Sequence, residues 1–291
     1  GIEPRFTSVR LRGFTANTEA LFRDGLALRN PLFIVSYNLE PYGAERIEIP
    51  RGPASALYGL GSPGGIINYI SKTPTDERIG EVGIETDNRD RKQIMFDVGG
   101  AMNESETVSF RLTGLYRDGG TQIDFVPDDR QYFAGALEWN LGDATSLTFL
   151  GSVQQDDAMN SQALPSAGTL TPNPNGVVPV SRFTGEPTLD KYDRGEYSIG
   201  YQFEHEFNDN LRFLQNTRLN DVDLDDIVVF STGFLPDLRT MTRNSFWNYG
   251  ELSSITIDNQ LHYAIEGGSV QHKLLFGVDW QDADGSSIQH I

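Results

Sequence analysis

The sequence predicts an all-β protein in two parts, a mixed N-terminal segment and then part of an antiparallel transmembrane β-barrel. From residue 78 onward, runs of about ten residues alternate between apolar and polar side chains, as barrel strands do. Short and long connections take turns between these runs. The chain contains no run of about 18 apolar residues, so a transmembrane helix is not expected.

Composition excludes several classes of function. The 291 residues include no Cys, which rules out disulfides, thiolate metal sites and Cys nucleophiles. The formal net charge of -18 and the lack of a basic patch argue against nucleic-acid binding. The four His residues share no ligand spacing, and no catalytic triad or carboxylate pair stands out, so neither a metal site nor an enzyme is expected.

The N-terminal segment is punctuated by Gly and Pro, and its best strand candidates are residues 9–14 and 47–49. Gly59, Gly61 and Gly64 match the pattern G-x-G-x-x-G. A dinucleotide site needs a strand before such glycines and a helix after them. Here residues 53–58 favour a short helix and the residues after Gly64 favour a strand, so the glycines are expected to serve a sharp backbone turn.

The second part holds about nine strand candidates. Period-two alternation is found in residues 132–141, 147–153, 197–207, 255–263 and 270–280. Aromatic residues recur near the predicted strand ends, as an interfacial girdle requires: Tyr116, Tyr132, Trp139, Tyr197, Trp247 and Trp280. A soluble β-sandwich is the alternative, and its strands are usually shorter.

The predicted connections fall into two classes. Residues 141–144 and 207–210 are short turns, whereas residues 118–130, 156–193 and 225–248 are long polar segments. The run Asp221, Asp223, Asp225 and Asp226 lies where the last of these segments begins. Because it lacks the Gly and terminal Glu of a Ca²⁺-binding loop, it is interpreted as a solvated strand end above a membrane.

One long string is more specific than any of these patterns. Residues 41–74 read PYGAERIEIPRGPASALYGLGSPGGIINYISKTP. This string closely resembles the plug of TonB-dependent outer-membrane receptors, in particular the ferric-siderophore branch with ferrichrome-like or hydroxamate-like cargo. The stretch SVRLRGF at residues 8–14 and Asp24-Gly-Leu26 match the same plug in order.

The resemblance implies a 22-stranded barrel with a plugged lumen. Residues 1–76 would be the C-terminal part of the plug and residues 77–291 about nine barrel strands. The protein would be a transporter in the bacterial outer membrane, in contact with lipid and lipopolysaccharide, and not an enzyme. Its partners would be a ferric siderophore and TonB, whose contact box is expected outside this sequence. Iron would be carried only as the chelate, with no cofactor.

Site residues follow from the same resemblance. Arg12, Arg29, Asn30 and Tyr42 fall at the plug apices that contact ligand, and a guanidinium suits an oxygen-rich chelate. For Arg12 a purely structural role is equally open, and for Tyr42 it is favoured.

Glu45, Arg46, Glu48 and Arg51 are expected to lock the plug to the barrel. Arg51 would pair with wall carboxylates from strands beyond this sequence. The alternative is a solvated run of charges.

Other functions stay open on the sequence. A TonB-dependent receptor for cobalamin or a glycan would share the plug, and so would a siderophore receptor with a signalling domain. Residues 160–163, before Leu164-Pro165, lack the aromatics that ferrichrome-type receptors carry there, which argues against a ferrichrome-like ligand. A soluble enzyme with a glycine-rich loop is disfavoured by the helix-then-strand order.

Overall fold

The computed structural model describes residues 9–15, 20–32, 34–51, 58, 62–160, 164–267 and 270–290. Strands dominate these residues, and the one helical element with defined bounds among them is the 3₁₀ helix η1, Pro41–Gly43. Within the described residues, no helix combines the length and the apolar composition needed to span a membrane.

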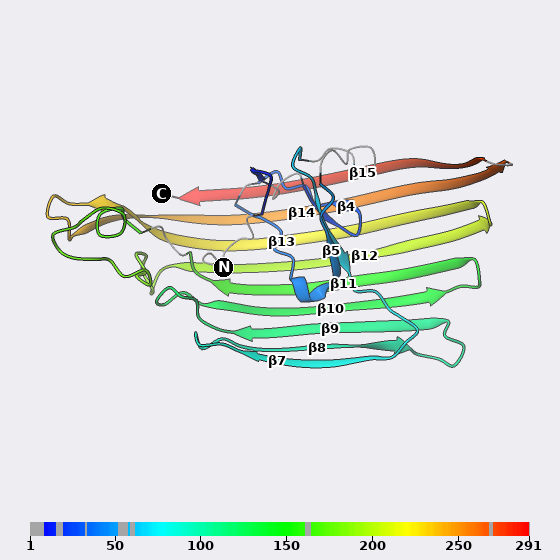
Figure 1. The fold of residues 1–291 in the computed structure, drawn as a ribbon, viewed down its shortest axis with the longest axis horizontal. Coiled ribbons are helices and arrows are strands. Elements are labelled where there is room, and N and C mark those ends of the chain that lie inside the picture. The colour runs from blue at the N-terminus through cyan, green and yellow to red at the C-terminus, as the bar shows by residue number, and fades with distance from the viewer. Residues whose placement is uncertain are drawn as a thin grey trace.

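Nine antiparallel strands form one sheet, called the wall, in which each strand pairs with the next in sequence (Figure 1). The strands are β7 Ile79–Thr86, β8 Lys92–Ala101, β9 Val108–Asp118, β10 Asp128–Asn140, β11 Thr145–Ala158, β12 Lys191–Asn208, β13 Leu211–Phe234, β14 Met241–Gly267 and β15 Val270–His290. The all-β, antiparallel prediction is confirmed, and β7 and β15 are the two edges of the sheet.

The two faces of the wall differ as the alternation requires. On the outer face, apolar side chains are exposed, among them Phe149, Tyr197, Ile199, Val278 and Trp280. The inner face is polar, and the plug segment covers part of it. Buried polar residues there include Asp97, Thr113, Ser198, Asn220 and Thr256. Successive residues of a strand point to opposite faces, so one chain produces both surfaces.

The strands are longer than predicted, and one predicted loop is wrong. Most of residues 225–248 belongs to β13 and β14, and only residues 235–240 separate them. Here β13 continues through the apolar residues 227–230, so much of the segment predicted as a polar loop is strand. The long connections 119–127, 159–190 and 235–240 lie at one end of the wall, the long-loop end. The connections 102–107, 141–144 and 209–210 lie at the other, the short-turn end.

The plug segment, the described residues from 9 to 74, lies on the inner face (Figure 1). It holds a hairpin of β1 Arg10–Leu11 and β2 Phe14–Thr15. It also holds a mixed sheet in the order β4-β3-β6-β5, with β3 Leu21–Arg23, β4 Leu26–Ala27, β5 Ala44–Glu48 and β6 Ile67–Ser71. The strand expected at residues 9–14 is therefore two strands around a turn, and the one expected at 47–49 begins at Ala44.

The described glycine of the G-x-G-x-x-G match serves backbone packing. Gly64 lies against the backbone carbonyl of Leu11, where a Cβ has no room, and Gly65 has a φ of +124°. Tyr58 is helical, but Gly59, Gly61 and the rest of the predicted helix lie outside the described residues.

Gly43 offers a test of how tightly the plug segment meets the wall. A Cβ at Gly43 would collide with the phenol group of Tyr132 from β10 and the hydroxyl of Tyr69 from β6. We expect Gly43→Ala to destabilise the folded protein by about 1–3 kcal/mol, because both tyrosines are buried and hold their positions. Chemical denaturation measures the loss. Gly80→Ala on β7, with open space around it, is the control and should change little.

Candidate functional site at the plug–wall interface

Residues 35–40 of the plug segment, called the strap, run across the wall strands near the long-loop end. Val35 packs over Gly250 of β14. The carbonyl of Ser36 accepts a hydrogen bond from Arg194 of β12 at 3.0 Å. Asn38 donates to Asp156 of β11 at 3.4 Å, and its carbonyl accepts from Gln154 at 2.7 Å. The strap therefore crosses the wall from β14 toward β10.

The strap lies along a row of charged residues on the inner face, called the charged row. Arg117, Arg130, Asp156 and Arg194 are directly paired across β9, β10, β11 and β12, so their side chains share one face. Asp156 accepts from Arg130 at 2.5 Å and from Arg194 at 3.1 Å. Arg194 also pairs with Glu196, one position further along the same face. The row thus holds three guanidinium groups and one carboxylate, and two wall carboxylates beside it, Asp128 and Glu196, pair with Arg117 and Arg194.

Glu40 at the end of the strap supplies the further charge. Its carboxylate pairs with Arg130 at 2.8 Å and with Arg117 at 3.7 Å, and it also accepts from the backbone N–H of Tyr42 at 3.0 Å. All three charged side chains are nearly excluded from solvent. A buried charge is tolerated when it is paired and hydrogen-bonded, so Glu40 both neutralises the wall and fixes the start of η1.

A second contact is made by the hairpin tip, Asp24–Gly25, between β3 and β4. Asp24 has a φ of +53° and Gly25 of +81°. The carboxylate of Asp24 pairs with the fully buried Arg218 of β13 at 2.6 Å and accepts from the N–H and hydroxyl of Ser71, each at 2.7 Å. The Asp24 carbonyl accepts from Asn216 at 2.7 Å. The tip is therefore anchored to β13 and to β6 at once.

Next to the tip, Arg23 is also buried. Its guanidinium donates to Ser152 of β11 at 3.1 Å and to Ser71 at 3.2 Å, and it lies 5.5 Å from the ring centre of Tyr69. Burial acts to lower the Arg23 pKa, but nearby negative charge and tyrosines outweigh it, and the pKa is raised.

A third contact joins the plug segment to β8 and β9. Arg111 pairs with Glu45 of β5 at 2.8 Å and with Asp97 at 2.8 Å. Lys72 pairs with the same Asp97 at 2.7 Å. Four charges of alternating sign thus connect two wall strands to two positions of the plug segment.

The predicted lock residues do not act as one group. Glu45 reaches the wall, whereas Arg46 pairs at 2.8 Å with Glu48 inside the plug segment, on its exposed side. Arg51 is exposed and forms a backbone bridge with Gly65. Its pairing with wall carboxylates from further strands stays a prediction. In the described interface most arginines come from the wall, and their carboxylate partners come from both the wall and the plug segment.

The predicted ligand residues also occupy different places. Arg12 is exposed in the β1–β2 turn with a φ of +53°, and Arg29 is half-buried. Asn30 is buried, and its amide closes its own loop through the N–H of Leu32 at 2.8 Å and the carbonyl of Val35. Of these four, Arg12 is the most exposed to an approaching ligand.

Tyr42 faces the wall. Its hydroxyl donates to Glu81 of β7 at 3.2 Å, and the ammonium of Lys72 lies 4.1 Å from its ring centre. Desolvation, followed by the charge of Glu81, raises the pKa of Tyr42 to about 12.

Sequence reasoning missed Asp24, Glu40 and the wall arginines. The strand alternation held a signal for the arginines. Arg111, Arg130, Arg194 and Arg218 fall in phase with the polar residues of their strands, which marks them as inner-face residues. Charged residues facing a barrel lumen need partners there, so their presence indicates acidic groups on whatever fills it.

The long connections form a joined layer above the strap. Asn173 donates to the carbonyl of Leu238 at 2.9 Å, and Arg243 donates to the carbonyl of Gly185 at 2.6 Å. The N–H of Asp124 donates to the carbonyl of Ser181 at 2.8 Å. Residues 159–190 are thus tied to both neighbouring connections. Ile123, Val126 and Phe183 form a small apolar core beneath them.

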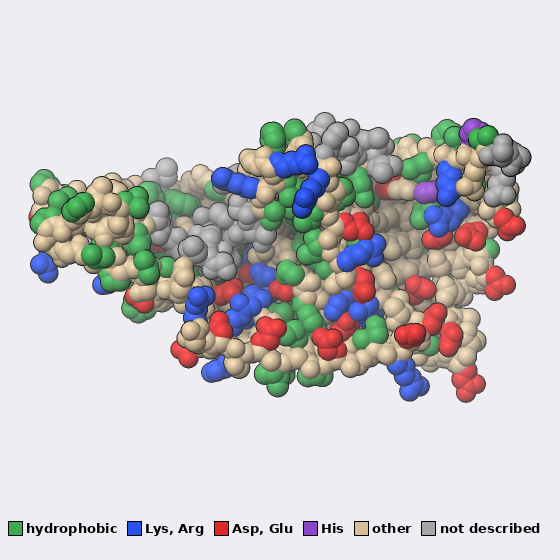
Figure 2. Space-filling model, viewed as in Figure 1, with side chains coloured by type: hydrophobic (Ala, Val, Ile, Leu, Met, Phe, Trp, Pro, Cys, Tyr) green, Lys and Arg blue, Asp and Glu red, His purple; other side chains and the backbone are tan. Residues whose placement is uncertain are grey.

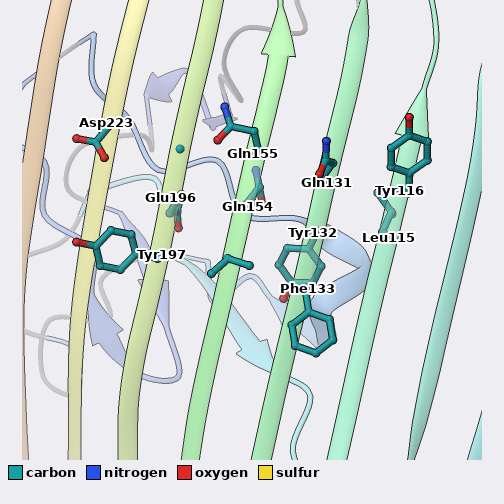
Figure 3. A pocket seen from close by; sticks show the side chains of 12 residues that line it. Leu115, Tyr116, Gln131, Tyr132, Phe133, Gln154, Gln155, Glu196, Tyr197 and Asp223 are labelled. Atoms are coloured by element: carbon teal, nitrogen blue, oxygen red, sulfur yellow. The ribbon is translucent and has the colours of Figure 1, made fainter.

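The outer face of the wall is hollowed between β9 and β13. A groove of about 570 Å³ is bordered by Tyr116, Gln131, Phe133, Tyr197 and Asp223 (Figure 3). Gly195 forms part of its floor. It belongs to the side away from the plug segment, so it is not part of the strap contacts.

Comparison with known proteins shows clear relatives. Residues 2–66 match the family model described as TonB-dependent Receptor Plug Domain. The chain is 33% identical over 286 residues to the ferrioxamine B receptor of Salmonella typhimurium strain SL1344, covering 97% of this chain and 40% of that protein. It is 31% identical to the ferrichrome outer membrane transporter/phage receptor of Escherichia coli K12, covering 96% and 40%. The chain thus spans about two fifths of the length of these relatives.

Solved structures share the fold. The pyoverdine-bound FpvA of P. aeruginosa aligns with a TM-score of 0.88 at 22% identity, covering 99% of this chain and 39% of that one. The catecholate import receptor Fiu of E. coli K12 aligns with a TM-score of 0.84 at 21% identity, covering 97% and 45%.

Because Glu40 pairs with two arginines of the wall, its removal should greatly weaken the docking of the strap on the wall. Glu40→Ala leaves Arg130 and Arg117 without their plug carboxylate, and we expect the docking of the strap to weaken by about 3 kcal/mol. Hydrogen exchange of residues 35–40 measures this. The control is Glu48→Ala, whose exposed pair with Arg46 should contribute less than about 1 kcal/mol. Equal effects of the two variants would contradict the charged-row account.

The buried hydroxyl of Tyr37 should make the stability of the folded protein depend on pH in the alkaline range. Burial raises the pKa of Tyr37 to about 12, although the hydroxyl is bonded to Ser254 at 3.0 Å. Above pH 10 the unfolded chain loses this proton while the folded chain keeps it, so stability falls as pH rises from 10 to 12. Tyr37→Phe should cost about 1 kcal/mol at pH 7 and flatten that alkaline decline. Denaturation curves across this pH range provide the check, and an unchanged slope would contradict it.

Proposed function

We propose that this chain, which belongs to the TonB-dependent receptors, is part of an outer-membrane receptor and transporter for ferric siderophores. The observation that carries the proposal is a plug segment bound by ion pairs to the polar face of a wall whose other face is apolar. That arrangement suits a gated pore in a lipid bilayer. The sequence relatives named above, receptors for ferrioxamine B and ferrichrome, support the same function.

Localisation follows from the two faces of the wall. The exposed apolar band would face outer-membrane lipid, including lipopolysaccharide beyond its upper edge, and the polar face would line a lumen. The connections that form the joined layer would face outward, and the short turns would face the periplasm.

The transport step makes and breaks no covalent bond, so the protein is not an enzyme. TonB would supply the energy by pulling on the plug, and the plug would move away from the wall. Besides the apolar cluster around Val35 and Tyr37, the contacts that hold the plug to the wall are hydrogen bonds and ion pairs, which water can replace on both partners as they separate.

The cargo we propose is a ferric hydroxamate of the ferrioxamine kind, bound from outside. Arg12 and Arg29 would contact it by charge-assisted hydrogen bonds to chelate oxygens. Iron would travel inside the chelate and not as an ion held by the protein. Asn30 and Tyr42 are the other two residues that we propose as ligand contacts. Their side chains also stabilise the plug segment through hydrogen bonds.

The test uses the full-length receptor in detergent micelles and in iron-limited cells. Ferric hydroxamates should quench tryptophan fluorescence at sub-micromolar concentration, and uptake should require TonB. Arg12→Ala should weaken binding about tenfold, since a charged hydrogen bond contributes roughly 1.5–3 kcal/mol. Arg46→Ala, in an exposed pair of the plug segment, is the control and should bind normally. Quenching by cobalamin or a glycan alone would contradict the proposal.

A further inference from the structure

A polar cavity of about 350 Å³ lies between the plug segment and the wall, on the short-turn side of the hairpin tip. Asp24, Gly25 and Thr73 border it from the plug segment. The wall borders it through strands β10 to β14, with inner-face side chains that include Glu138, Thr148, Glu204, Asn216, Asp258 and Gln260. Its volume is in the range of small-molecule pockets.

The charge of this cavity is of one sign. Three wall carboxylates border it, and no Lys or Arg is among the described residues that line it. Glu204 is neutralised by Arg212 at 2.9 Å. Glu138 accepts from Thr148 at 3.5 Å and Asp258 accepts from Gln260 at 2.6 Å, and both of these donors are uncharged. Within the described part of the chain, Glu138 and Asp258 therefore keep their negative charge uncompensated.

The long-loop half of the inner face is different. There the guanidinium groups of Arg117, Arg130 and Arg194 are balanced by Glu40, Asp156 and Glu196. The inner face thus changes from a balanced region to a negative one toward the short-turn end. Figure 2 shows Asp and Glu side chains prevailing on the face to the right of the plug segment, which is the short-turn side.

From this change of charge along the lumen we propose that the cavity is a cation-preferring stage of the transport path, so the receptor carries cationic chelates faster than anionic ones. This inference rests on the proposed function and adds the charge class of its cargo. Glu138 and Asp258 are the residues that determine it. In a site of reduced dielectric constant, two uncompensated carboxylates attract a cationic chelate and repel an anionic one.

The hairpin tip forms the roof of the cavity. Asp24 is bound to Arg218 and Ser71, and its carbonyl to Asn216, which itself borders the cavity. A chelate therefore enters the cavity only after the tip has left the wall. The charge preference should accordingly act on the rate of transport and leave binding at the outer surface unchanged.

The experiment uses cells that make the full-length receptor and three ferric complexes of one linear trihydroxamate. The terminal group of the trihydroxamate is a free amine, an acetylated amine or a succinylated amine, which gives a cation, a neutral chelate and an anion. Binding is measured by fluorescence quenching and transport by uptake of radioactive iron at saturation. The test variant is Glu138→Gln/Asp258→Asn. The control, Asp157→Asn/Asp223→Asn, changes the net charge equally at exposed aspartates that lie outside the cavity lining.

We expect the wild type to carry the cation about fivefold faster than the anion, with similar binding of all three. The test variant should carry the cation and the anion at rates within about twofold of each other. Each single variant should have a rate ratio between those of the wild type and the test variant. The control should have the wild-type ratio. Equal uptake of all three chelates by the wild type would overturn the inference and leave the proposed function intact. A charge ratio that persists in the test variant would also overturn it. Failure of the wild type to bind any chelate would instead contradict the proposed function.

Discussion

The wall of this protein buries arginines that pair with the plug segment as well as with wall carboxylates, and Arg218 takes its carboxylate partner from the plug segment. Arg130 and Arg218 reach their plug partners Glu40 and Asp24 at 2.8 and 2.6 Å. An unpaired guanidinium in such a position would cost several kcal/mol, so the folded wall and the docked plug segment depend on each other. The remaining contacts of the strap and the hairpin tip are arranged around these pairs.

This dependence has a consequence for function. Hydrophobic contacts between the plug segment and the wall form two clusters, a larger one around Val35, Tyr37 and Leu224 and a smaller one where Tyr42 packs on the wall, and polar contacts surround them. A polar interface holds the plug segment in one position, because each pair has a fixed geometry. The same interface can be rehydrated when the plug is pulled, because every separated group finds water as a partner. The plug segment can therefore close the lumen firmly and still be released when it is pulled.

Much of the fold was predictable, because period-two alternation over long runs reports directly on which face of a strand meets lipid. The antiparallel sheet and its polar inner face follow from that pattern. The extent of β13 and β14 was not predictable, because their ends break the alternation: residues 227–230 are all apolar and residues 242–245 are all polar. The contacts of Glu45 with Arg111 and of Asp24 with Arg218 depend on residues 66 and 194 positions apart. Such pairings depend on the strand register and on the path of the plug segment across the wall, and neither can be read from a single sequence.

The measurement that tests the charge balance most directly is a double-mutant cycle between Glu40 and Arg130 in the full-length protein, with docking of the strap followed by hydrogen exchange. If the plug segment neutralises the wall, the two substitutions to Ala should be coupled by about 2–3 kcal/mol, because removing both charges relieves the cost of leaving one buried alone. Additive effects, with a coupling energy near zero, would mean that packing holds the plug segment on the wall and that the ion pairs contribute little to its docking.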